Sequence, residues 1–323
     1  MLMTPGTRGG RKSQNKNYSD LIIGSLPGGT LTLTPGVGDT VTDVVGATSI
    51  YYTPTFGGGI PLPYGSGWKR VPFGETALGL NATFHTANTN YDVWGFFDNG
   101  GLSIASKNWF DTTNPANPSD PTSTVYTSRQ VATAGVIVNA NGMTVRNGST
   151  TTTLAPGSAR LLGSFRTTSA GQTEDSFTKR FLSRLDYPAV RPFRKSGPAS
   201  DWTYATATIR QINADSTMKV GWLHCVGTRF IDLQTFICAA INSTTTTRTY
   251  RSGIGIDSTT AFSNSARGGP ANCSSNSWIP SISNYRDSPG IGFHEANWLE
   301  IAAGADTQTL AAFTSALTGW TMN

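Results

Sequence analysis

Asn-Gly dipeptides between short apolar segments constrain the fold of this chain more than any other feature. They occur at Asn99-Gly100, Asn141-Gly142 and Asn147-Gly148, and the residues on either side favour strands. Asn and Gly tolerate the positive φ that a two-residue β-hairpin turn requires. Residues 90–106 therefore predict a hairpin, and residues 135–165 predict a β-meander.

The composition extends this prediction to the whole chain. Charged residues make up 13% of its 323 residues, well below the roughly 25% of an average soluble domain, while 36 Gly and 17 Pro supply many turns. Short strands whose hydroxyl and amide side chains face outward fit this composition. We predict an all-β fold of antiparallel β-sandwich or jelly-roll-like domains with many hairpins and an extended N-terminal arm.

One segment leaves its secondary structure open. In residues 173–185, two acidic residues near the start suit the N terminus of a helix, and Phe177, Phe181 and Leu185 recur every four residues. A strand fits the same residues, so the sequence does not choose between helix and strand here.

The prediction divides the chain into four regions. Residues 1–20 form a basic arm without a periodic apolar pattern, and residues 21–162 form one or more N-terminal β domains. Residues 163–198 form a charged crossover, and residues 199–323 form a C-terminal β-sandwich domain. The arm carries four basic residues that we expect to dock onto a partner: Arg8, Arg11, Lys12 and Lys16.

The net charge of +5 is concentrated in the arm and in residues 165–210. The arm lacks interleaved aromatic residues, and acidic residues interrupt the second cluster, so we do not predict nucleic-acid binding. No stretch approaches the roughly 20 apolar residues of a membrane span, and no apolar run follows the basic residues near the start. We therefore expect no membrane insertion and a chain that folds where it is made.

Residues for metal or nucleophilic chemistry are scarce and scattered. The histidines His85, His224 and His294 are isolated in the sequence, and the HEANW segment that begins at His294 ends in Trp298, which cannot bind a metal. The three cysteines form no C-x-x-C pair, so we expect reduced thiols. We predict no metal site, no cofactor and no enzymatic activity.

Two kinds of glycan chemistry stay open. A glycosidase needs only two suitably separated carboxylates, and the candidates are Asp92, Asp98, Glu295 and Glu300. Aromatic rings of the C-terminal part either stack on sugars or, as large rings more often do, fill a core or a subunit interface. These aromatic residues are Trp278, Tyr285, Trp298 and Trp320.

Several segments, in the same order along the chain, resemble a structural module of tailed bacteriophages and prophages. They include LTLTPG, TDVVGATSIYYTP, IPLPYGSGWKRVPF, NYDVWGFFDNGGLSIAS, RLLGSFRTTSAGQTEDSFTKRFLSRLDY and HEANWLEIAAGADTQT. The resemblance covers nearly the whole chain after residue 20. It implies a part of a tail fibre, spike or head decoration, located in the virion and assembled in the bacterial host cytoplasm.

Residues 162–181 resemble a hallmark of this module, a strand ending in GSFRTT that is followed by a turn and QTEDSFTKRF. We interpret them as a crossover between two β regions, in which Arg166 or Lys179 pairs with Glu174 or Asp175. The hydroxyl side chains then satisfy backbone groups that the turn leaves open. In this interpretation the crossover residues are structural.

The leading hypothesis is a non-enzymatic structural protein of the virion. It forms a homotrimer, docks by its arm onto other capsid or tail proteins and projects its β domains. Low surface charge favours association, and the resemblance implies threefold symmetry. The alternatives are a glycan-degrading tailspike and a receptor-binding adhesin that recognises a bacterial surface glycan through Trp278, Tyr285 and Trp298.

Overall fold

The computed structural model describes residues 28–38, 42–55, 58–109, 129–132, 135–241, 248–263, 266–268, 271–273, 278–302, 307–312 and 315–323. Across these residues it contains strands, turns and one short 3-10 turn at Ile212–Ala214, and no α-helix. The predicted all-β fold is confirmed. The four basic residues of the arm lie outside the described residues.

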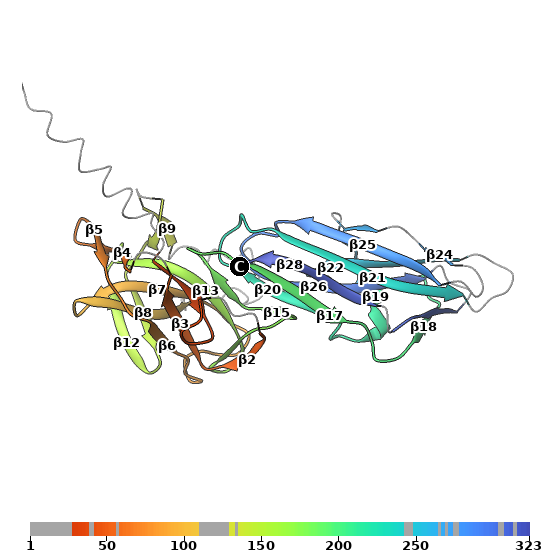
Figure 1. Cartoon of the computed structure of the whole chain (residues 1–323), viewed down its shortest axis with the longest axis horizontal. Helices are drawn as coiled ribbons and strands as arrows, with labels where there is room; N and C mark the ends of the chain where they lie inside the picture. The colour runs from red at the N-terminus through yellow and green to blue at the C-terminus, as the bar shows by residue number, and fades with distance from the viewer. Residues whose placement is uncertain are drawn as a thin grey trace, which may run out of the picture.

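The strands form two lobes that are joined end to end along the long axis of the molecule (Figure 1). The N-terminal lobe contains β1 (Gly29–Thr32), β2 (Val44–Ala47), β3 (Ser49–Pro54), β4 (Ile60–Tyr64), β5 (Gly67–Val71), β6 (Thr76–Gly79), β7 (Asn90–Asp98), β8 (Gly101–Asn108), β9 (Arg129–Val131), β10 (Ile137–Asn139), β11 (Met143–Asn147), β12 (Thr150–Leu154) and β13 (Ala159–Ser169). Three short strands follow at the boundary: β14 (Gln172–Asp175), β15 (Lys179–Arg180) and β16 (Leu182–Arg184). The C-terminal lobe contains β17 (Val190–Ser196), β18 (Trp202–Tyr204), β19 (Arg210–Gln211), β20 (Lys219–His224), β21 (Ile231–Ile241), β22 (Arg248–Ile256), β23 (Ala266–Gly268), β24 (Ala271–Cys273), β25 (Ile279–Asp287), β26 (Gly292–Ala302), β27 (Gln308–Leu310) and β28 (Ala316–Met322).

The C-terminal lobe is a sandwich of two sheets. One sheet has the strand order β17-β28-β21-β25-β23, and strands β20-β26-β22-β24 form the other layer. Side chains from both layers form one core, in which Trp222, Tyr250 and Trp298 of the second layer pack with Leu233 and Leu317 of the first. Because successive strand residues point to opposite faces, each strand supplies alternate residues to this core.

The N-terminal lobe buries both faces of its main sheet. The small sheet β1-β3-β6 covers one face, where Leu31 and Ile50 belong to the same core as Val93 of β7. The next residue of β7, Trp94, points to the other face and joins a second core with Val145. Long strands such as β7 are therefore buried along most of their length.

The hairpin prediction at Asn99-Gly100 is confirmed. Asn99 and Gly100 have φ values of 46° and 87°, and they connect β7 to β8, which pair in antiparallel register up to Asp98 and Gly101. These positive φ values are the ones that a two-residue hairpin turn demands.

The hairpin at Asn147-Gly148 is also confirmed, because β11 and β12 pair in antiparallel register around it. Asn147 is the last paired residue of β11, opposite Thr150, so the turn begins one residue later at Gly148. The dipeptide Asn141-Gly142 connects β10 to β11, but β10 pairs with β9 and β13, while β11 pairs with β8 and β12. The predicted hairpin at this position is wrong, because a turn signal is local whereas the choice of strand partner is made by the sheet.

Residues 173–185 form strands, which decides the alternative that the sequence left open. β14 pairs with β13 and β2, and β15 pairs with β14 and β20. Glu174 and Asp175 are both buried within this arrangement. Pairing with distant strands thus prevails over the local helical pattern.

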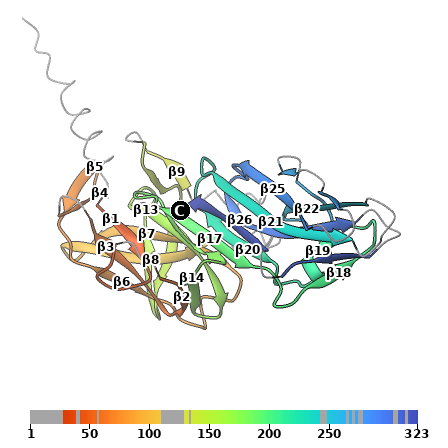
Figure 2. The same ribbon diagram turned by 45° about the vertical axis from the view of Figure 1, so that its right-hand side comes forward.

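The predicted crossover at 163–198 is not a separate region of the structure. β13 is a strand of the N-terminal lobe, and β17 is a strand of the C-terminal lobe. Between them a single hydrogen-bonded path, β13-β14-β15-β20, carries one 16-stranded sheet from one lobe into the other. Figure 2 shows β14 and β20 on either side of this boundary.

Candidate functional site

The boundary between the lobes holds the densest group of buried charges among the described residues. Asp175 at the end of β14 accepts a hydrogen bond from Arg180 Nη1 at 3.0 Å and one from Arg191 Nη2 at 2.7 Å. All three side chains are at most 5% exposed. We call these three residues the Asp175 cluster.

The Asp175 cluster joins three strands from the two lobes, β14, β15 and β17. Burial lowers the pKa of the Arg180 guanidinium, and the neighbouring carboxylate of Asp175 opposes that shift. Arg180 also donates two hydrogen bonds to the carbonyl oxygen of Pro192 in β17, which satisfies more of its donors. A buried ion pair whose remaining groups are hydrogen-bonded in this way fixes geometry, because breaking it leaves an uncompensated charge.

The crossover residues named from the sequence separate into two groups. Lys179 Nζ lies 3.0 Å from Glu174 Oε2, and Ser176 donates a hydrogen bond to Glu174 Oε1 at 2.6 Å. Asp175 pairs with arginines that the sequence analysis did not assign to it. The sequence shows how many basic residues this region contains, but only the strand register places two particular arginines within hydrogen-bond distance of Asp175.

The predicted pairing of Arg166 or Lys179 with Glu174 or Asp175 is met by Lys179 and Glu174, whereas Arg166 has other partners. Arg166 donates a hydrogen bond from Nη1 to Asn90 Oδ1 at 2.9 Å, and its guanidinium lies 3.8 Å from the centre of the Phe293 ring. Burial lowers the pKa of Arg166 to about 10, and the carboxylate of Glu295 opposes the shift. Arg166 therefore connects β13 with β26 by ring stacking.

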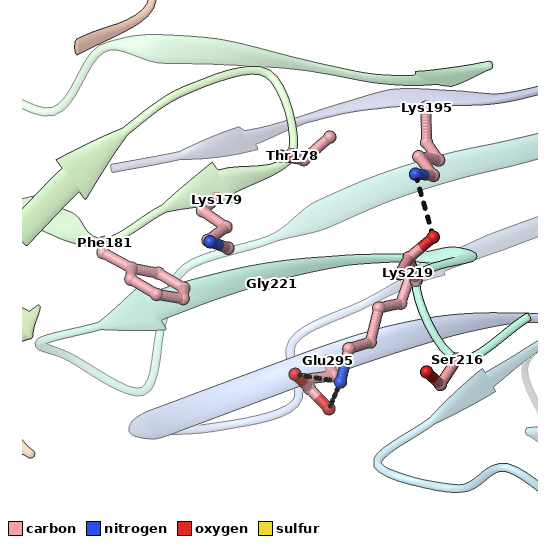
Figure 3. A pocket seen from close by; sticks show the side chains of 9 residues that line it. Thr178, Lys179, Phe181, Lys195, Ser216, Lys219, Gly221 and Glu295 are labelled. Carbon is pink, nitrogen blue, oxygen red and sulfur yellow. Dashed lines mark hydrogen bonds and ion pairs between the residues drawn. The ribbon is translucent and has the colours of Figure 1, made fainter. Parts of the chain in front are cut away.

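A pocket with a volume of about 440 Å³ lies at the boundary between the lobes (Figure 3), and two of its lining residues, Lys179 and Phe181, flank Arg180 of the Asp175 cluster in the chain. Lys179 and Phe181 line it from the boundary, Lys195 from β17, Lys219 from β20 and Glu295 from β26. These elements bring together three ammonium groups that are separated in the sequence.

The three lysines of the pocket have different partners. Lys179 pairs with the buried Glu174, and Lys219 Nζ lies 2.9 Å from Glu295. Lys195 Nζ lies 3.4 Å from the hydroxyl oxygen of Thr217, a weak contact with a neutral group. Figure 3 shows the ammonium group of Lys219 directed toward Glu295 and away from Lys195, with the ring of Phe181 beside β20.

His85 and Ser106 form a contact that resembles a nucleophile and its base. Their atoms Nε2 and Oγ are 2.8 Å apart. The backbone N–H of Asn81 donates to His85 Nδ1 at 2.9 Å, and the Asn81 carbonyl oxygen lies 3.2 Å from the same atom, so the donor and acceptor roles of the ring nitrogens depend on the tautomer. Ser106 donates its proton to the carbonyl oxygen of Arg146. A serine whose proton is already donated to a backbone carbonyl is not poised to transfer it to the histidine.

The candidate carboxylates lie in different places. Asp92 is buried in the N-terminal lobe and accepts hydrogen bonds from Trp109 Nε1 and Ser164 Oγ, each at 2.7 Å. Glu300 is buried in the C-terminal lobe, where Trp202 Nε1 and Arg210 Nε donate to it at 3.0 and 2.8 Å. Both carboxylates serve as acceptors within a core.

The remaining two acids do not complete a catalytic pair. Asp98 is exposed beside the β7–β8 turn, and Glu295 is bound to Lys219 in the pocket. No two of the four candidate acids face each other across a described cavity.

The aromatic residues named as glycan contacts do not form one platform. Trp298 is buried and donates from Nε1 to Ser252 Oγ at 2.8 Å, and Tyr285 is also buried. Both rings belong to the core of the sandwich, so the core-filling alternative is confirmed for them and the sugar-stacking alternative is wrong. Trp278 is 48% exposed, and Trp320 is partly exposed.

In the described part of the chain no group of three or more His, Cys, Asp or Glu side chains is placed to hold a metal ion. Cys225 and Cys238 are free thiols, and the side chain of Cys273 lies outside the described set. Over the same residues no helix is long and apolar enough to cross a membrane.

No family model matches the chain, and no curated protein matches it.

Proposed function

We propose that this chain is a structural protein of a bacteriophage virion, a fibre, spike or capsid decoration that projects a stiff two-lobed rod from the particle. It assembles as a homotrimer and docks by its basic arm onto other virion proteins. The proposal assigns no reaction and no cofactor to the chain. It rests on the resemblance of the sequence to phage structural modules and on the construction of the boundary between the lobes.

The observation that carries the proposal is the continuous sheet across that boundary. A flexible linker between domains leaves them free to move, whereas inter-lobe strand pairing resists bending. The Asp175 cluster adds a buried ionic contact at the same place. A projecting part of a particle must transmit force and hold its direction, and a boundary built in this way suits that task.

The receptor-binding alternative has one observation in its favour. The pocket at the boundary between the lobes is basic, partly apolar and large enough for a small ligand. Binding a host glycan and projecting from the particle are compatible, so the alternative adds a role to the same architecture.

The proposal is tested on phage particles from a bacterium whose phage encodes this chain. An antibody raised against residues 190–323 should label purified particles in electron micrographs, at sites that repeat with the symmetry of the head or the tail. Particles without label, with the chain recovered only from the soluble fraction of the lysed host, would contradict a structural role in the virion.

A further inference from the structure

The pocket between the lobes has the composition of a binding site for a small anion that also carries hydroxyl groups. Its volume of about 440 Å³ falls within the range of pockets that hold small ligands. It forms only when the lobes are joined, because Phe181 and Lys179 come from the boundary while Lys195 and Lys219 come from the sandwich.

The charge balance of the pocket favours an anion with a single negative charge. Three lysines line it, and two carboxylates, Glu174 and Glu295, each neutralise one of them. Within the described part of the chain, Lys195 has no carboxylate within ion-pair distance, and its one hydrogen-bond contact, at 3.4 Å, is the neutral hydroxyl of Thr217. Asp215 attracts the Lys195 ammonium from farther away, and because Asp215 is partly exposed, water weakens that attraction and leaves most of the Lys195 charge available to a ligand.

The lining groups also suit a ring with several hydroxyl groups. Lys179 and Lys219 are 45% and 38% exposed, so their ammonium groups remain available as donors. The hydroxyls of Thr178 and Thr217 donate and accept hydrogen bonds. The ring of Phe181 supplies an apolar wall, against which the C–H face of a sugar packs.

We propose that this pocket binds a carboxylate-bearing sugar, a hexuronic acid of a free or surface-attached saccharide. Its carboxylate lies against Lys195, and its hydroxyls lie between Lys179, Thr217 and Lys219. A phosphate group with two negative charges fits less well, because Glu295 stands in the same wall and repels the second charge. This inference goes beyond the proposed structural role, and a chain that binds no particle still carries the same pocket.

The proposal is tested by calorimetric titration of the whole chain with glucuronate, with glucose and inorganic phosphate as comparison ligands. We expect a Kd for glucuronate on the order of 1 mM at low salt, as suits a ligand of this size. Glucose and phosphate should each bind at least about tenfold more weakly, and added salt should weaken the binding of glucuronate. No heat of binding for glucuronate at about 10 mM, or equal binding of glucose, overturns the proposal.

Three variants assign the binding to this pocket. Lys195→Gln should weaken glucuronate binding about tenfold, whereas Glu295→Gln should strengthen it several-fold, because one removes an attracting charge and the other a repelling one. Lys107→Gln on β8 of the other lobe is the matched control and should leave Kd unchanged. All three should keep the wild-type thermal midpoint within about 2 °C. If both pocket variants are folded and their Kd values for glucuronate are unchanged or change in the opposite directions, the ligand does not bind in this pocket and the proposal is wrong.

Discussion

A single buried histidine, His224, combines tight packing with a titration in the acidic range. It is fully buried, and its Nε2 lies 2.8 Å from the hydroxyl oxygen of Thr321. Burial, helped by the nearby His294 and Arg229, lowers the pKa of His224 from 6.5 to about 3. Between about pH 6.5 and pH 3 the ring therefore stays neutral in the folded chain while the same ring is charged in the unfolded chain.

The sign of the resulting pH dependence is fixed. Above about pH 6.5 both states are neutral, and below it only the unfolded chain binds the proton, so the free energy of unfolding falls as pH drops from about 6.5 towards 3. Between about pH 7 and pH 5 this residue should cost about 2 kcal/mol of stability. Urea unfolding of both proteins at about pH 7 and pH 5 measures this effect. The decrease in the free energy of unfolding should be about 2 kcal/mol smaller in His224→Gln than in the wild type. An equal drop in both proteins would remove His224 as the cause.

The three short strands at the boundary are held by strand pairing and buried ion pairs that cannot be predicted from neighbouring residues. Asp175→Ala should leave Arg180 and Arg191 buried without their shared carboxylate. We expect a loss of about 3 to 5 kcal/mol in the free energy of unfolding, measured by denaturant titration. Hydrogen exchange should rise first in β14, β15 and β20, because these strands carry the sheet across the boundary.

The matched control for this variant is another acid that faces an arginine, at the surface. Asp232 and Arg286 are 3.9 Å apart and are 35% and 73% exposed, so Asp232→Ala should cost less than about 1 kcal/mol. Equal losses in the two variants would show that the Asp175 cluster adds no more than a surface pair.

At the scale of the whole molecule, the described surface carries apolar residues that suit an interface between copies. Val190 and Phe230 are 62% and 50% exposed, and both lie beside the same residue of β28, since Val190 pairs with Met322 and the Met322 N–H donates to the Phe230 carbonyl. Tyr187, which is 42% exposed, lies close by in the chain. Large exposed side chains gathered in one place mark surfaces that other proteins cover.

We predict that the purified chain is a trimer. Light scattering should give about three times 34.2 kDa, and the mass should persist on dilution if the interface is obligate. Phe230→Ser should lower this mass, whereas a polar substitution at the equally large but distant Tyr64 should not. A monomer at micromolar concentration would remove the fibre and spike forms of the proposed function and leave a monomeric decoration.

Features that depend on neighbouring residues alone could be predicted from the amino-acid sequence. The turn at Asn99-Gly100 could be predicted because positive φ is a property of those two residues. The all-β class followed from composition and from short apolar segments, which need no knowledge of their partners.

The strand partners, in contrast, depend on contacts between residues that are distant in the chain. Residues 173–185 form strands because they pair with distant strands, and Trp298 and Tyr285 are buried because the two sheets of the sandwich pack together. The strand register likewise places Arg180 and Arg191 beside Asp175. The pocket is likewise invisible in the sequence, since its lysines come from three separate strands. The physical reason is the same in each case: sheet pairing joins residues far apart in the chain, and its energy exceeds the small local preferences that a sequence pattern records.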